Sequence, residues 1–132
     1  TQGMAEYIIY AGSYFTVEWY YDRSGESDAS QFYFDLNTKE RQRAMALFKR
    51  MADAGEIKDI TKFRNEGDGI YAFKPQPDRF LCFFTRGKRI IVTGGFRKTT
   101  EKLPVQEKKR AQNRRDDYEN RVQEGTYYED DL

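Results

Sequence analysis

The chain has no histidine and a single cysteine among its 132 residues. Histidine is the usual general acid or base at neutral pH, and with cysteine it supplies most zinc ligands. Their scarcity excludes histidine-based acid–base pairs, Cys–His nucleophiles and the common zinc sites. Cys82 has no second cysteine for an internal disulfide, which is typical of a reducing compartment. We therefore expect a cytoplasmic protein with no metal and no cofactor.

Long apolar runs and nucleotide-binding glycine motifs are absent as well. No run reaches the roughly 18 apolar residues that a membrane span needs, so we expect no membrane partner. The start of the sequence lacks the basic region and apolar run of a secretory signal. Neither a P-loop nor a GxGxxG motif follows a strand, and Gly94-Gly95 alone indicates a backbone kink. The length predicts one domain over residues 1–132.

What the chain does have is charge that is strongly segregated. The net charge is only +1, but residues 74–115 carry thirteen basic and three acidic side chains. Residues 116–132 carry seven acidic side chains and one basic one, and residues 1–73 are mildly acidic. This distribution predicts a basic surface for an anionic partner beside an acidic tail over residues 124–132.

The apolar pattern predicts an α+β fold. Residues 6–10 are expected to be extended, and residues 14–21 alternate as a strand does. Residues 69–93 contain three apolar runs that we expect to pair as a small antiparallel sheet ending at Thr93-Gly94-Gly95. Two helices lie between them, one beginning at Asp28 with Gln31 as capping partner and one from Asn37 to Gly55. We expect them to form an αα-hairpin that covers the sheet.

The remaining segments are predicted from composition. Residues 57–68 indicate a polar connection, with Ile60 and Phe63 turned inward. Pro104 opens a basic C-terminal helix over about 104–123 on the surface of a core formed by residues 6–103, and the acidic end is expected to be loose. The predicted core aromatics of the central sheet are Tyr71, Phe73, Phe80, Phe83 and Phe84.

Without histidine, any catalysis has to use lysine, arginine, tyrosine or carboxylates. Phosphoryl transfer on RNA suits such a set, because the 2′-hydroxyl already lies beside the phosphate. The protein then has mainly to align the groups and stabilise phosphorane charge. A lysine that acts as a base would need a pKa well below about 10.4, which clustered positive charges can bring about.

Three segments resemble a known family. GIYAFKP, from Gly69, is similar to a Gly-Leu-Trp-Glu-Leu-Arg strand of the RelE/HigB-like toxins, and RFLCFF, from Arg79, to their Tyr-Arg-(Ile/Val)-Phe-Tyr-Phe strand. GGFRKTTEKLP, from Gly94, resembles their His-Gly-Phe-x-Lys-Lys-Thr-x-Lys-Thr-Pro segment, and the basic helix that follows ends, as theirs does, in Asp-Tyr. The chain thus resembles a type II toxin of the RelE/ParE superfamily, in its phage-derived HigB-like branch.

The resemblance implies a RelE-like fold and a ribosome-associated endoribonuclease that cuts mRNA and is inhibited by a helix-turn-helix antitoxin. Matched position by position, it implies catalytic roles for Arg79, Lys74 and Lys98. Nucleic-acid contacts are expected from the other basic positions and one tyrosine, namely Arg97, Lys102, Lys88, Arg89, Arg110, Arg114 and Tyr118, the last either stacking on a base or anchoring the helix. Two positions depart from the family: Gly94 stands where it has His, and Ala72 where it has Glu.

Two alternatives stay open at this point. The same fold could belong to a ParE-like inhibitor of DNA gyrase with no chemistry of its own. The missing histidine is also compatible with a non-catalytic RNA- or protein-binding member of the fold.

Overall fold

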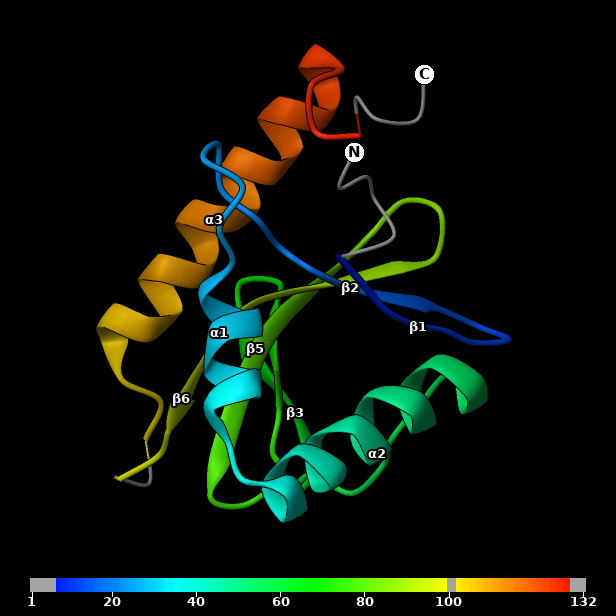
Figure 1. Ribbon diagram of the computed structural model, residues 1–132, viewed down its shortest axis with the longest axis vertical. Helices are drawn as coiled ribbons and strands as arrows, with labels where there is room; N and C mark the ends of the chain where they lie inside the picture. Colours follow the sequence, from blue (N-terminus) through cyan, green and yellow to red (C-terminus); the bar gives the residue numbers. More distant parts are fainter. Residues whose placement is uncertain (1–6, 100–101, 129–132) are drawn as a thin grey trace.

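Six strands form one sheet in the order β1-β2-β6-β5-β4-β3 (Figure 1). The computed structural model describes residues 7–99 and 102–128. The strands are β1 (Ile8–Ala11), β2 (Thr16–Trp19), β3 (Phe63–Gly67), β4 (Ile70–Phe73), β5 (Asp78–Thr85) and β6 (Arg89–Arg97). The α+β class is confirmed, but the sheet is mixed, because β2 pairs with β6 in parallel while the other pairs are antiparallel.

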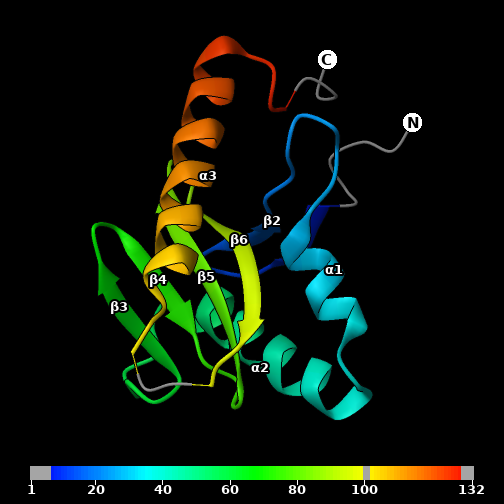
Figure 2. The ribbon, with the colours of Figure 1, turned by 90° about the vertical axis from the view of Figure 1, so that its left-hand side faces the viewer.

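Three helices cover the two faces of this sheet. Helices α1 (Asp28–Asp35) and α2 (Thr38–Ala54) lie on one face and α3 (Val105–Glu124) lies on the other (Figure 2). Successive side chains of β5 point to opposite faces of the sheet. Phe80 and Cys82 pack toward α1 and α2, whereas Leu81 and Phe83 pack toward α3. The chain therefore has two apolar layers, one on each side of the sheet.

The ends of the helices follow from local sequence. Asn37 and Glu40 form a reciprocal capping box at the start of α2, as expected, and Gly55 ends that helix with φ of 82°. The capping residue of α1 is Ser27, which accepts a hydrogen bond from the Ser30 amide, and not Asp28 as predicted. The expected αα-hairpin is wrong, because α1 and α2 run in different directions across the sheet (Figures 1 and 2).

Two predicted boundaries of the sheet are wrong. The polar connection before residue 68 contains the edge strand β3, and Ile60 is 67% exposed instead of turned inward. Strand β6 continues through Gly94 and Gly95 to Arg97, with a register shift opposite Leu81 and Cys82 that leaves Thr93 unpaired. This bulge is the kink that the two glycines indicated, but the strand does not end there.

The expected loose C-terminus is wrong for residues 125–128. Gly125 ends α3 in the left-handed region, and the chain then turns back so that Tyr127 is fully buried. Tyr127 packs between Tyr21 and Tyr118 in the layer beneath α3. The four acidic-end residues 129–132 lie outside the described residues.

The predicted core aromatics fall into two groups. Phe73, Phe80 and Phe83 are buried, whereas Tyr71 is half-buried and Phe84 is 36% exposed. No helix in the described part of the chain is long and apolar enough to cross a membrane.

Candidate functional site

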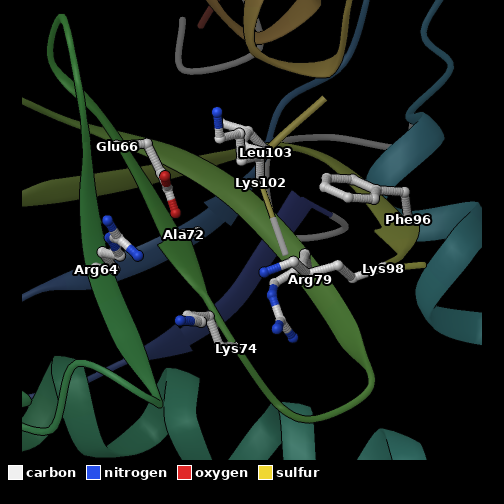
Figure 3. Close-up of a pocket in the computed structure, with 9 residues that line it drawn as sticks. All are labelled: Arg64, Glu66, Ala72, Lys74, Arg79, Phe96, Lys98, Lys102 and Leu103. Atoms are coloured by element: carbon white, nitrogen blue, oxygen red, sulfur yellow. The ribbon is translucent and has the colours of Figure 1, made fainter. Parts of the chain in front are cut away.

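A pocket of about 230 Å³ opens on the α3 face of the sheet. It lies next to the N-terminal end of that helix, where Lys102 and Leu103 precede the first turn. Four strands and the segment before α3 contribute to it, and its described lining residues are Arg64, Glu66, Ala72, Lys74, Arg79, Phe96, Lys98, Lys102 and Leu103 (Figure 3). Because five of the nine are lysine or arginine, we call it the basic pocket.

The basic character follows from the position of α3. Side chains at alternate positions of one strand share a face, and on β5 this row reads Arg79, Leu81, Phe83. Leu81 and Phe83 lie beneath α3, whereas Arg79 lies where the helix no longer covers the sheet. On β4 the row likewise changes from Ile70 to Lys74 at its end. The apolar rows thus become basic at the uncovered end of the sheet.

Arg79 forms part of the floor of the pocket and is only 7% exposed. Its Nη1 donates to the Asp78 carbonyl oxygen at 2.8 Å and to Oε1 of Gln76 at 3.2 Å. Burial lowers the pKa of this guanidinium. These bonds hold one edge of the guanidinium, so its orientation is set before any ligand arrives.

Lys74 is a half-buried lysine of the pocket lining. Its Nζ donates to the Ile60 carbonyl oxygen at 3.1 Å. Burial is the largest cause that lowers its pKa, followed by the positive charges of Arg79, Lys98 and Arg64. Its ammonium group therefore releases a proton more readily than that of an exposed lysine.

The pocket brings together four of the residues singled out from the sequence, Lys74, Arg79, Lys98 and Lys102. Arg97 is not among them, because adjacent strand residues point to opposite faces. It pairs with Glu40 at 2.6 Å and with Asp78 at 3.5 Å on the side of α2. These ion pairs join α2 to the sheet, on the side of the sheet away from the basic pocket.

Lys88 and Arg89 lie at the other end of β6, away from the basic pocket. Lys88 is an exposed turn residue between β5 and β6, where its φ of 57° completes a tight connection. Arg89 packs 4.3 Å from the centre of the Tyr128 ring and 3.5 Å from a carboxylate oxygen of Glu18. This arginine helps to hold the C-terminal segment on the sheet.

The basic face of α3 is largely occupied by structural contacts. Arg114 donates to the Thr93 carbonyl oxygen and pairs with Asp28 of α1. Arg110 is exposed and pairs with Glu107 one turn earlier at 2.9 Å. Tyr118 is 3% exposed and packs on Phe83, so the anchoring role weighed for it fits the structure and base stacking does not.

Sequence reasoning missed Arg64, Glu66, Phe96 and Leu103. The first two belong to β3, in which Phe63 is followed by three polar residues, so no apolar alternation marks this strand in the sequence and only its pairing with β4 reveals it. Phe96 and Leu103 give the pocket a partly apolar wall. Such a wall opposite cations suits a nucleotide, which has an apolar face and an anionic phosphate.

The described residues contain no group of three or more metal-ligating side chains. The described lining of the pocket offers convergent cations and one carboxylate. Lysine and arginine around a small hollow are the groups that hold phosphoryl oxygens.

The sequence model of the family described as "Phage derived protein Gp49-like (DUF891)" matches residues 31–116. The chain belongs to this family. Well over half of the chain is covered, and every described residue of the basic pocket lies inside the matched region. No curated protein matches the chain.

The Gp49-like family is part of the RelE/HigB toxin-like superfamily, so the resemblance seen in the sequence is confirmed at that level. It is related to the toxins of toxin–antitoxin systems, and membership implies an antitoxin partner. The position where the resemblance expects His is Gly94, which lies on β6 beside Arg114 and is not a lining residue of the basic pocket.

Proposed function

We propose that this Gp49-like protein is a toxin that cleaves mRNA at the ribosome by phosphoryl transfer in the basic pocket. The observation that carries the proposal is the convergence of five cations on one hollow of about 230 Å³, namely Arg64, Lys74, Arg79, Lys98 and Lys102. These residues come from separate strands and connections, and an RNA phosphate is the kind of ligand that such a set recognises.

The proposed reaction is attack of a ribose 2′-hydroxyl on the adjacent phosphorus. Arg79 and Lys98 would stabilise the negative charge that develops on the phosphoryl oxygens. Lys74 would donate a proton to the departing 5′-oxygen, a role that its lowered pKa favours. Phe96 and Leu103 would pack against the base or ribose beside the cleaved bond.

The test is inducible expression, followed by labelled methionine incorporation, DNA supercoiling and the 5′ ends of cellular mRNA. We expect translation to stop first and new mRNA ends to appear. The double variant Arg79→Ala/Lys98→Ala should relieve the arrest. Lys49→Ala/Arg50→Ala is the matched control, because it removes two exposed charges of α2, outside the lining of the pocket.

Three outcomes would contradict the proposal. If the Arg79/Lys98 variant still arrests translation, the basic pocket is not the catalytic site. Loss of supercoiling before loss of translation would support a ParE-like gyrase inhibitor instead. Harmless expression without antitoxin would support a non-catalytic binding protein.

The antitoxin that family membership implies is proposed to be a small helix-turn-helix protein. Co-expression of such a protein from the neighbouring gene should restore growth and co-purify with the toxin. Failure to bind would exclude that candidate.

A further inference from the structure

Glu66 places a carboxylate inside the basic pocket. It lies on the edge strand β3, at the register shift between Asn65 and Gly67 where β3 pairs with β4. Its side chain extends from β3 over the sheet toward Ala72 (Figure 3). Within the described lining of the pocket it is the one acidic residue.

Two other carboxylates, those of Asp68 and Glu40, form ion pairs with basic side chains, whereas Glu66 does not within the described part of the chain. Asp68 pairs with Lys108 at 2.8 Å, and Glu40 pairs with Arg97 at 2.6 Å. Glu66 forms no hydrogen bond and no ion pair with any residue that the structure describes. Its charge nevertheless acts on the site, because it raises the pKa of both Lys74 and Arg79 against the effect of burial.

The position of Glu66 relative to the cations leaves room for a substrate. Strand β4 lies between β3 and β5, so Glu66 and Arg79 flank it from opposite sides. On this face β4 presents Ala72, whose methyl group is the smallest side chain of the pocket lining. A ribose and its phosphate could lie over Ala72, with the phosphate toward Arg79 and the sugar toward Glu66.

RNA cleavage by the 2′-hydroxyl needs a group that accepts a proton. Arginine and a protonated lysine have no lone pair to offer, and the described chain has no histidine. A carboxylate is ionised at neutral pH and can accept a proton at once. We propose that Glu66 is the general base that takes the proton from the attacking 2′-hydroxyl.

This inference rests on the proposed function and completes its proton balance. The O2′–P bond forms and the P–O5′ bond breaks, giving a 2′,3′-cyclic phosphate and a 5′-hydroxyl. The proton of the 2′-hydroxyl passes to the Glu66 carboxylate, and the 5′-oxygen receives one from the Lys74 ammonium. No metal, oxidant or further reactant enters the step.

The test compares Glu66→Gln with wild type in single-turnover cleavage of RNA, free and on programmed ribosomes, over a range of pH. Glutamine keeps the shape of the side chain but cannot act as the base. We expect cleavage about 10²- to 10⁴-fold slower and loss of the rise in rate on the acidic side of the pH profile. Binding of a substrate with a 2′-deoxy sugar at the cleavage site should be equal or tighter, because a negative charge near the phosphate is removed.

Glu119→Gln is the matched control, since it changes the net charge equally on an exposed part of α3. It should cleave at the wild-type rate, and thermal melting should show both variants folded. Wild-type cleavage by Glu66→Gln, or a loss explained by weaker binding alone, would overturn the role of Glu66 and leave the proposed function standing. Absence of cleavage by the wild-type protein under both conditions would overturn both.

Discussion

The guanidinium of Arg114 fills the space beside Gly94. A Cβ atom on Gly94 would lie 2.9 Å from Nη1 of Arg114, which donates to the Thr93 carbonyl oxygen at 2.8 Å. The same side chain pairs with Asp28, so it joins α3 to β6 and to α1. Gly94 therefore gives Arg114 access to the bulge, and the position where the toxin family has His is taken up here by a structural contact.

Gly94→Ala should displace Arg114 and destabilise the fold by about 1–2 kcal/mol, through loss of the charged hydrogen bond to Thr93. Arg114→Met should cost at least as much, because it also removes the ion pair with Asp28. Chemical denaturation of both single variants and the double variant measures the coupling. Because Arg114→Met already removes the contact beside Gly94, the double variant should resemble Arg114→Met, and additive effects would contradict the contact.

Arg64 should matter for RNA binding although only the fold reveals it. Arg64→Ala removes a cation of the basic pocket, whereas Lys49→Ala removes an exposed one on α2 that lies outside its lining. We expect Arg64→Ala to weaken binding of single-stranded RNA and to reduce the salt slope by about 0.7, the value for one phosphate contact. Equal effects of the two variants would indicate that RNA does not use the pocket.

Deprotonation of Lys74 should cause the fall in cleavage rate at alkaline pH, which is the alkaline limb of the pH–rate profile. Its pKa is lowered from 10.5, so the ammonium donor is lost at a pH below that value. In Lys74→Arg the side chain stays protonated, and this limb should disappear while the rate falls. Cleavage rates measured from neutral to alkaline pH test this. An unchanged limb in the variant would assign the proton donor elsewhere.

Asp78 should contribute more to the stability of the fold in acid than at neutral pH. Its side chain is fully buried and its carboxylate oxygens make no hydrogen bond to a described residue. Burial, and then the charge of Glu40, raises its pKa above 3.8. A raised native pKa means that the contribution of Asp78 to stability is full below 3.8 and is lost as the pH rises through the native value.

Asp78→Asn removes the free-energy cost of burying the charged carboxylate at neutral pH. We expect it to stabilise the fold at neutral pH by roughly 1 kcal/mol and to give no gain below the ordinary aspartate pKa. Denaturation at the two pH values measures the difference. A variant that is less stable at neutral pH would show that the Arg97–Asp78 ion pair outweighs the burial of the charge.

Local patterns in the sequence determined much of the fold. The capping box at Asn37, the stop at Gly55 and the start of α3 after Pro104 depend on contacts within a few residues, so they were predictable. The change from apolar to basic side chains was also predictable, because Lys74 and Arg79 lie at the ends of the apolar runs that form β4 and β5. Apolar alternation and capping residues act locally, and the sequence displays them directly.

Tertiary structure decided which cations meet. Arg97 and Lys98 are neighbours in sequence, yet one faces α2 and the other lines the basic pocket, because the Thr93 bulge and the strand alternation set their faces. Arg64 and Glu66 join the site only because β3 pairs at the edge of β4. Pairing order and register depend on contacts between distant segments. The sequence alone therefore determined a toxin-like chain with a basic segment over residues 74–115, and the fold decided where the basic pocket lies.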